Sequence, residues 1–540
     1  MKQLLSTLIF ALLSIAAFPC TNLIVTKGAS ADGSAFLVYT NDGEWLYQLG
    51  NQPAADHQPG DSISYKSGRN QVEGKIHQVS HTYAVIGFQM NEHQLAVGET
   101  TFTGRGELWN HSKYLQYWHL MRLALERAKT AREGVEVITA IVEQYGYGSE
   151  GESFSLVDPN EAWILEMIGT GDGGEGAVWV ARKIPDGMIS AHANMARIGE
   201  FPLDDPENCV YSKNVISFAV EKGYYNPKSG ESFLFNEVYN PSSPDRLKYC
   251  ESRVWSLFRR AAPTQEFSPD YHRGVQRAER YPLWIAPDAK LSLEDVMALV
   301  RDHYEGTDYD MTQGLEAGPF GSPNRWRPLT WDNEDGDSYS WERPISTYNT
   351  CFSFIGQMRA WLPDDVGGIC WFGVDDTYFT CYVPLFVGNT LVPEAFTKGD
   401  INHFSQESMW WTFNFVSNFA NLKYSHMIKD IQTVQQELES EMIRQVDSIT
   451  NAVMKLSETE RIETLTAFSN SWGETVHHRW QDLGYHLITK YNDGYVKDEK
   501  GKIEEAPYPD DWIDQINTLN RDKHKLPQWN TDKKQEHLPY

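Results

Sequence analysis

The sequence predicts an α+β fold, in which strands and paired helices form a core and long helices complete the C-terminal part. Three observations lead to this prediction. Short apolar runs of strand character fill much of the first 200 residues and return near residue 350. Apolar positions recur at helical spacing over 113–143, and helical periodicity continues from 405 to 491. Segregated strands and helices are typical of α+β layers, whereas alternating strands and helices would indicate a parallel sheet.

The first predicted element is a β-hairpin that begins at Cys20. Two short apolar segments flank Asp32-Gly33, and Asp-Gly between such segments is a strong hairpin signal. The second strand returns beside the first one. We therefore expect Asn41 and Asp42, at the end of that strand, to lie near Cys20.

Further strands are expected where apolar runs are bounded by turn residues. After a polar excursion at 50–74, these runs are 82–90, 94–100, 153–157, 162–167, 177–184, 188–193, 350–358, 368–373 and 377–384. Short connections join the four runs between 153 and 193. We therefore predict that these four strands form one antiparallel meander.

Helices are expected where apolar residues recur every three or four positions. These segments are 113–143 (two helices broken near Gly134), 252–261, 293–304, 409–424, 427–454 and 457–491. Ser292 and Asp295 form a capping-box signal at the start of the helix at 293–304. We predict a core over residues 20–400 and a helical region over 401–540 packed on it.

Residues 1–19 have the pattern of a secretory signal peptide followed by a short propeptide. Lys2 supplies the positive start, and the apolar run 4–17 is too short to span a bilayer comfortably. A further cleavage at the Pro19-Cys20 bond would free the α-amine of Cys20. We therefore expect a secreted or periplasmic protein, and no later stretch resembles a membrane span.

Composition excludes several classes of function. Hydrophobic residues make up 41% and aromatic residues 13%, which is typical of a packed globular protein, and the net charge of -27 argues against nucleic acid as a partner. The histidines lack metal-ligand spacing and no glycine-rich phosphate loop is present, so we predict neither a metal nor another cofactor.

Five cysteines remain besides Cys20, an odd number that does not suit a disulfide framework. A bridge between Cys370 and Cys381, and assembly into a homo-oligomer, both stay open.

Cys20 has three interpretations. It is a buried or disulfide-bonded structural residue, a lipid-attachment cysteine, or an N-terminal nucleophile. Lipid attachment requires a small residue immediately before the cysteine, whereas bulky Phe18 and then Pro19 precede it here. A cysteine that begins a chain carries a thiol and an α-amine with a reference pKa of about 8, and that amine can act as the base that activates the thiol.

The chain resembles the cysteine dipeptidases of the N-terminal-nucleophile superfamily, to which penicillin V acylases and bile salt hydrolases are more distantly related. The resemblance lies in 20–25 (CTNLIV), 29–34 (ASADGS), Asn41-Asp42, 91–93 (NEH), 98–101 (GETT), 161–166 (EAWILE), 193–198 (ANMARI), 317–321 (AGPFG) and 357–384. These segments follow the family order over nearly the whole chain after residue 19. The resemblance implies four layers, αββα, with two antiparallel sheets stacked between helices.

The resemblance also implies roles for individual residues. Cys20 corresponds to the nucleophile, which passes through a thioester, and its α-amine corresponds to the general base. Asp42 corresponds to the acid that positions the amine, and Asn194 to the asparagine that stabilises the oxyanion. Thr101 stands where the acylase relatives have a second asparagine, and Tyr39 stands where the superfamily usually has arginine.

Two further groups of residues are candidates for binding the ends of a peptide. The guanidinium groups of Arg197 and Arg343 suit a substrate carboxylate, although either residue could equally form a structural ion pair. Glu99, Glu152 and Glu166 suit a substrate amine, or they simply belong to strands.

We therefore predict a secreted or periplasmic hydrolase of dipeptides or short peptides. Two alternatives stay open. One is a linear-amide acylase of the penicillin V acylase type. The other is a lipid-anchored surface protein whose many Trp and Tyr residues line a glycan or peptide groove.

Overall fold

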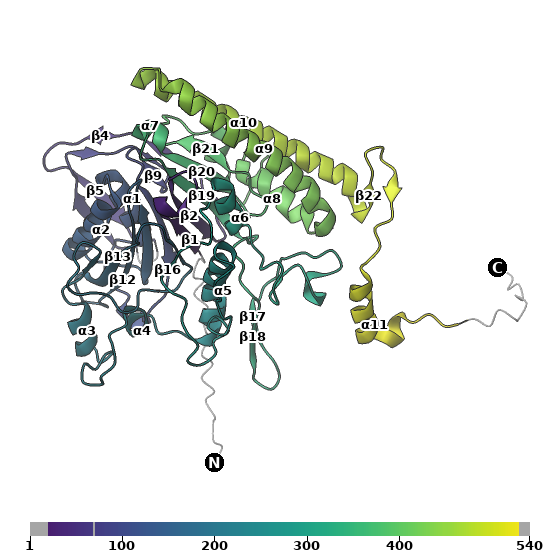
Figure 1. Ribbon diagram of the computed structural model, residues 1–540, viewed down its shortest axis with the longest axis horizontal. Helices are drawn as coiled ribbons and strands as arrows, with labels where there is room; N and C mark the ends of the chain where they lie inside the picture. The colour runs from purple at the N-terminus through teal and green to yellow at the C-terminus, as the bar shows by residue number, and fades with distance from the viewer. Residues whose placement is uncertain (1–19, 69–70, 529–540) are drawn as a thin grey trace, which may run out of the picture.

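The computed structural model describes residues 20–68 and 71–528, so the predicted leader at 1–19 lies outside the described residues. Two antiparallel sheets form the core of the protein (Figure 1). One sheet contains β1 (Cys20–Val25), β2 (Ala35–Asp42), β14 (Ile189–His192), β16 (Trp284–Ile285), β19 (Thr350–Met358), β20 (Ile369–Val374) and β21 (Val383–Phe386). Its strand order is β16-β14-β1-β2-β19-β20-β21.

The second sheet contains β3 (Asn51–Gln52), β8 (Val85–Ile86), β9 (Met90–Asn91), β10 (Ala96–Thr101), β11 (Glu152–Val157), β12 (Ala162–Gly169), β13 (Ala177–Lys183) and β15 (Cys209–Tyr211). Its order is β15-β13-β12-β11-β10-β9-β8-β3. Small two-stranded sheets pair β4 (Ala55–Asp56) with β7 (His81–Thr82), β5 (Ser62–Lys66) with β6 (Glu73–His77), β17 (Thr330–Asp332) with β18 (Ser338–Ser340), and β22 (Val496–Lys497) with β23 (Ile503–Glu504). The two large sheets face each other, since β10 contacts both β1 and β2.

The hairpin at the start of the described chain is confirmed. β1 and β2 pair antiparallel, with Cys20 opposite Asn41. The turn is stabilised locally because the Asp32 carboxylate accepts hydrogen bonds from the backbone N–H of Ser34 at 2.9 Å and from its hydroxyl at 2.8 Å. Gly33 adopts φ +86°, a left-handed conformation that glycine adopts without steric cost.

Helices lie against both sheets. The helices of the described chain are α1 (Tyr117–Arg127), α2 (Ala131–Tyr145), α3 (Val215–Glu221), α4 (Phe235–Tyr239), α5 (Pro244–Ala261), α6 (Leu293–Val300), α7 (Asp364–Gly367), α8 (Met409–Ala420), α9 (Tyr424–Val453), α10 (Glu458–Tyr491) and α11 (Asp510–His524). α1 and α2 contact the eight-stranded sheet, whereas α5, α8, α9 and α10 contact the seven-stranded sheet. The described residues include no helix that is both long and apolar enough to cross a membrane.

The predicted break near Gly134 is wrong, because Gly134 lies inside α2. The break between α1 and α2 is at 128–130, where the Thr130 hydroxyl accepts a hydrogen bond from the backbone N–H of Glu133 and caps α2. A Cβ atom at position 134 would lie 2.5 Å from a methyl carbon of Leu156. Glycine therefore lets α2 approach the sheet closely and does not end the helix.

The predicted four-stranded meander is correct for three strands only. β11, β12 and β13 pair in sequence, but the fourth strand, β14, leaves this sheet and pairs with β1 in the other one. Asn22 lies opposite His192 in this pairing. The crossing of β14 brings the residues that follow it to the start of β1, beside Cys20.

The other predicted boundaries of strands and helices differ less from those in the structure. The predicted strand at 82–90 is interrupted by Gly87, which adopts φ +55°, and divides among β7, β8 and β9. The capping box of Ser292 and Asp295 is confirmed, but α6 ends at Val300. The long C-terminal helices are confirmed, and α10 packs on α8, α9 and β21.

Candidate active site

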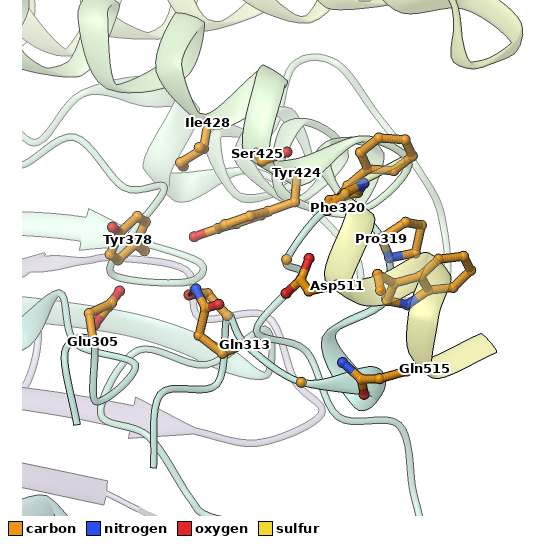
Figure 2. Close-up of a pocket in the computed structure, with 16 residues that line it drawn as sticks. Glu305, Gln313, Pro319, Phe320, Tyr378, Tyr424, Ser425, Ile428, Asp511 and Gln515 are labelled. Atoms are coloured by element: carbon orange, nitrogen blue, oxygen red, sulfur yellow. Dashed lines mark hydrogen bonds between the residues drawn. The ribbon is translucent and has the colours of Figure 1, made fainter. Parts of the chain in front are cut away.

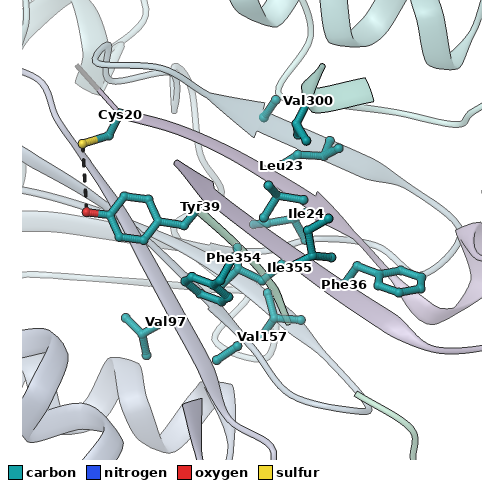
Figure 3. Packing of buried hydrophobic residues seen from close by; sticks show 14 of the residues in the cluster. Cys20, Leu23, Ile24, Phe36, Tyr39, Val97, Val157, Val300, Phe354 and Ile355 are labelled. Atoms are coloured by element: carbon teal, nitrogen blue, oxygen red, sulfur yellow. Dashed lines mark hydrogen bonds between the residues drawn. The ribbon is translucent and has the colours of Figure 1, made fainter. Parts of the chain in front are cut away.

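Cys20 begins β1, and its thiol points toward the hydroxyl of Tyr39 (Figure 3). Its side chain is buried, and the thiol donates to Glu99 Oε1 at 3.4 Å and lies 4.0 Å from the Tyr39 hydroxyl. Asn41 Nδ2 donates to Sγ at 3.7 Å. Burial, and then the charges of Glu99 and Asp42, raise the pKa of the Cys20 thiol well above its ordinary value, so the thiol is protonated in this environment.

Tyr39, at the position where the superfamily usually has arginine, is part of this hydrogen-bond cluster. Its hydroxyl donates to Glu99 Oε1 and accepts from Asn41 Nδ2 at 2.7 Å. Burial, followed by the charges of Cys20 and Glu99, raises the pKa of Tyr39 well above its usual range. Tyr39 is therefore a neutral hydrogen-bond donor and supplies no positive charge to the thiol. Its predicted role in substrate binding stays a prediction.

Asn194 lies directly beside Cys20, as a result of the crossing of β14. Its Oδ1 accepts a hydrogen bond from the Cys20 backbone nitrogen at 3.0 Å, and its Nδ2 donates to the Thr101 carbonyl at 2.8 Å. The backbone of Asn194 adopts φ +64°, a left-handed conformation that asparagine tolerates better than most residues. The side chain is thus held at both ends, which fixes the position of its amide beside Cys20.

Arg253, on α5, is a residue of the site that the sequence does not single out. Its guanidinium is fully buried and donates from Nη1 to the Cys20 carbonyl at 2.7 Å and to Thr21 Oγ1 at 3.0 Å. Nη2 donates to the Ala193 carbonyl at 3.1 Å and to Asn194 Oδ1 at 3.0 Å. Arg253 therefore joins the start of β1 to the segment after β14. The only signal in the sequence is an arginine within the apolar periodicity of 252–261.

Asp42 lies at the end of β2 and forms a buried ion pair with Arg343. Its carboxylate also accepts from Thr350 Oγ1 at 2.6 Å. Arg343 donates in addition to Thr347 Oγ1 at 2.9 Å and to Asn349 Oδ1 at 3.1 Å, and its side chain is buried. Arg343 therefore forms the structural ion pair that was one of its two interpretations. The role of Asp42 in positioning the Cys20 amine stays a prediction.

Replacing Arg343 with methionine is expected to destabilise the fold by about 3–5 kcal/mol at neutral pH, because the Asp42 carboxylate is left buried without its cation. Without Arg343 the pKa of Asp42 rises further above its unfolded value. Stability is then lost as the pH rises through that raised pKa, so the loss is expected to be small below about pH 4. Chemical denaturation at several pH values measures this dependence.

The matched control is Arg444→Met, since Arg444 pairs with Glu441 on the exposed face of α9. Exposed ion pairs contribute little to stability, so this variant is expected to unfold nearly as wild type does. Equal losses in the two variants would contradict a buried pair between Arg343 and Asp42.

The other two predicted binding residues have internal partners. Thr101 Oγ1 donates to Glu152 Oε2 at 3.0 Å. Arg197 donates from Nη1 to the Ala191 carbonyl at 2.6 Å, and its Nε lies 3.4 Å from Glu251 Oε1. Arg197 is therefore a buried structural residue here, and none of these contacts supports binding of a substrate carboxylate.

Glu166 shapes the same segment from β12. Its carboxylate accepts the backbone N–H of Arg197 at 2.6 Å and that of Ile198 at 3.0 Å. Burial raises the pKa of Glu166 to about 7 in spite of these hydrogen bonds. Glu166 thus fixes the backbone that follows Asn194, and it has no contact that indicates a substrate amine.

Cys370 and Cys381 do not form a disulfide bond with each other in the structure, so the bridge that stayed open between them is absent. Within residues 20–68 and 71–528, no three His, Cys, Asp or Glu side chains lie together in a way that could hold a metal ion.

A pocket of about 450 Å³ lies apart from this cluster, between the segment 312–321, the start of α9 and α11 (Figure 2). Glu305 and Tyr378 line it from the core, and Asp511 and Trp512 line it from α11. None of the residues around Cys20 described above belongs to its lining.

Comparison with known proteins places this site in a family. The sequence profile described as "Peptidase family C69" matches residues 19–437, which begins at the residue before Cys20 and includes every site residue described above. A "Probable dipeptidase" of Salmonella dublin is 28% identical over 402 residues, covering 71% of this chain and 84% of that protein. A "Probable dipeptidase" of Latilactobacillus sakei is 26% identical over 395 residues, covering 70% and 76%.

"Probable dipeptidase A" of Streptococcus pyogenes serotype M1 is 26% identical over 448 residues, covering 78% of this chain and 86% of that protein. The matched region contains both large sheets and the cluster around Cys20. Since the profile covers well over half of the sequence, the chain belongs to peptidase family C69.

Proposed function

We propose that the protein is an exported cysteine dipeptidase whose nucleophile is the thiol of Cys20 and whose general base is the α-amine of the same residue. One observation carries this proposal. The nitrogen, the carbonyl and the thiol of Cys20 each contact a buried polar side chain, from Asn194, Arg253 and Glu99 respectively. A residue fixed at all three groups is held in one geometry, which is what a nucleophile with its own base requires.

In the proposed reaction, the α-amine takes the thiol proton while Sγ attacks the carbonyl carbon of the peptide bond. The tetrahedral oxyanion then collapses to a thioester, and the leaving amine takes a proton from the ammonium group. Water hydrolyses the thioester and restores the thiol. The side-chain amide of Asn194 is the proposed donor to the oxyanion, and Thr101 supplies the carbonyl that orients this amide.

Dipeptides are the proposed substrates because relatives that match this chain over most of their length are named as probable dipeptidases. Secretion or transport to the periplasm is proposed from the signal-like pattern of residues 1–19. We further propose that the two facing sheets, with helices against each, are the four-layer αββα sandwich of N-terminal-nucleophile hydrolases. The helical region after residue 400 is an addition to that sandwich.

A panel of dipeptides, tripeptides and acyl amides tests the proposed activity, with mass spectrometry of the purified protein's N-terminus. We expect hydrolysis of dipeptides by a chain that begins at an unmodified Cys20. Hydrolysis of phenoxyacetyl amides without hydrolysis of dipeptides would indicate an acylase. A diacylated Cys20, or full activity with Pro19 still attached, would contradict the amine-base mechanism.

Removal of residues 1–19 is also expected to change the reactivity of the thiol. Burial and neighbouring carboxylates raise the pKa of Cys20 in the chain described here, and an α-ammonium group on the same residue favours the thiolate. We expect iodoacetamide at pH 7 to alkylate Cys20 at least about tenfold faster in a chain that begins at Cys20. Peptide mapping measures alkylation of Cys20 in each form of the chain, with Cys209 in the same sample as the reference. Equal alkylation rates of Cys20 with and without residues 1–19 would contradict this expectation.

A further inference from the structure

Two buried glutamates lie next to each other beside the Cys20 thiol. Glu99 is on β10 and Glu152 is on β11, and both side chains are fully buried. Thr101 lies directly opposite Glu152 in the sheet, and Glu99 is two residues before Thr101. Glu99, Thr101 and Glu152 therefore share one face of the sheet, the face on which Glu99 reaches Cys20.

The donors available to this pair satisfy only half of its oxygen atoms. Glu99 Oε1 accepts from the Tyr39 hydroxyl and from the Cys20 thiol, and Glu152 Oε2 accepts from the Thr101 hydroxyl. Among the described residues, Glu99 Oε2 and Glu152 Oε1 are buried without a donor, and neither carboxyl group forms an ion pair with a lysine, arginine or histidine. The two carboxyl groups lie close enough to interact, so a proton shared between them would join these two oxygen atoms.

Such a pair requires a positive charge or a shared proton. A buried carboxylate without a cation is unfavourable, and two adjacent carboxylates cannot both ionise at small cost. Burial, and then the charge of Glu99, raises the pKa of Glu152 well above its usual range. The pair is thus prepared for a cation that no described side chain supplies.

We infer that the Glu99–Glu152 pair binds the α-ammonium group of the substrate, and so restricts cleavage to the bond after a single free N-terminal residue. This inference rests on the proposed dipeptidase function. In any peptide, the amine nitrogen lies about 2.5 Å from the carbonyl carbon of its own residue. Glu99 Oε1 lies 3.4 Å from Sγ, so a first carbonyl in position for attack can bring its ammonium group within hydrogen-bond reach of Glu99.

The same geometry rejects acyl amides. A penicillin V-type or N-acetylated substrate brings no cation, and it would leave both carboxyl groups without a partner when the site closes over it. Sites that hold buried polar groups for one substrate reject the analogue that lacks the matching group by about 10⁴–10⁵. The pair therefore separates a dipeptidase from an acylase on the same fold.

Release of a proton on substrate binding is a second expected property of the glutamate pair. The side chains whose charges act most strongly on the pair are acids: Cys20 on β1, Tyr39 and Asp42 on β2, Tyr117 on α1, Tyr147 after α2, and Glu150 before β11. A mature chain that begins at Cys20 adds the α-amine of that residue to this group. On this inference, the pair shares one proton when no substrate is bound. Binding of an ammonium group replaces that positive charge and releases the proton to solvent.

The test compares alanyl-alanine with propionyl-alanine, which lacks only the amine, in wild type, Glu99→Gln and Glu152→Gln. Wild type is expected to prefer alanyl-alanine by at least 10³-fold in kcat/KM. Each glutamine variant is expected to lose about 10²-fold or more on alanyl-alanine, mainly through KM, so that the preference for alanyl-alanine over propionyl-alanine falls by a similar factor. Glu126→Gln is the matched control, because Glu126 is also a buried glutamate but pairs with Arg122 on α1. This variant is expected to leave the preference for alanyl-alanine unchanged.

Calorimetry on Cys20→Ala, which cannot turn over, gives a readout independent of activity. Alanyl-alanine is expected to release close to one proton per molecule bound in buffers of different ionisation enthalpy, and Glu152→Gln to abolish this release. Equal losses on both substrates, or binding without proton release, would overturn the inference while leaving the dipeptidase intact. Wild type that cleaves no dipeptide would overturn the proposed function, and the binding experiment then decides the role of the pair separately.

Discussion

The Cys20→Ala variant is expected to lose dipeptidase activity by about 10⁴-fold or more in kcat, because the substitution removes the sulfur atom that is the nucleophile in the proposed mechanism. Removal of the nucleophile from comparable hydrolases has effects of this size, since the remaining groups act only through it. Its fold is expected to remain, because a methyl group replaces a small buried side chain. Steady-state kinetics on alanyl-alanine and thermal unfolding measure the two quantities on the same preparation.

Cys209→Ala is the matched control for this experiment. Cys209 lies on the edge strand β15, is buried, and burial raises its thiol pKa to about 11. Its loss is expected to leave kcat unchanged. Activity retained in Cys20→Ala, or lost equally in Cys209→Ala, would place the nucleophile elsewhere.

The Asn194→Gly variant is expected to lower kcat by about 10²–10³-fold with a smaller effect on KM. The Oδ1 of Asn194 accepts from the Cys20 nitrogen, which holds the amide beside the nucleophile, and the Nδ2 of the same amide is the proposed donor to the charge that develops in the transition state. Glycine is the informative substitution because position 194 adopts φ +64°, which glycine tolerates without strain. A loss of activity then reports the missing amide and not a displaced backbone.

Asn194→Ala provides the comparison. Alanine lacks the same amide but is strained at positive φ, so it is expected to cost about 1 kcal/mol more in stability than glycine, with a similar loss of kcat. If glycine restored most of the activity that alanine loses, Asn194 would be a conformational residue rather than a donor to the oxyanion.

Local sequence was sufficient wherever neighbouring residues decide the structure. Asp32 and Gly33 build the first turn from their own side chain and backbone freedom, and Ser292 with Asp295 caps α6 through contacts within four residues. Long periodic segments likewise predicted α9 and α10 to within a few residues. The resemblance of many short motifs, in order, predicted the family that the comparison confirms.

The wrong prediction of a helix break at Gly134 has a physical cause as well. Glycine is a poor helix former, so the sequence favours a break there. The contact of α2 with Leu156 requires a residue without a side chain, and this tertiary contact overrides the local preference. The actual break is at 128–130, where Thr130 caps the following helix.

The sequence by itself determined the hairpin that carries Cys20, the long helices and the family, because the signals for these lie in adjacent residues or in ordered motifs. Only the tertiary structure decided that β14 pairs with β1, that Arg253 joins Cys20 to Asn194 from 233 residues away, and that Glu99 meets Glu152. Strand pairing depends on which faces become buried together, and the periodicity of one strand does not specify its partner in another sheet. The contacts around Cys20 therefore depend on how the two sheets pack, whereas Cys20 itself could be identified as the candidate nucleophile from the sequence.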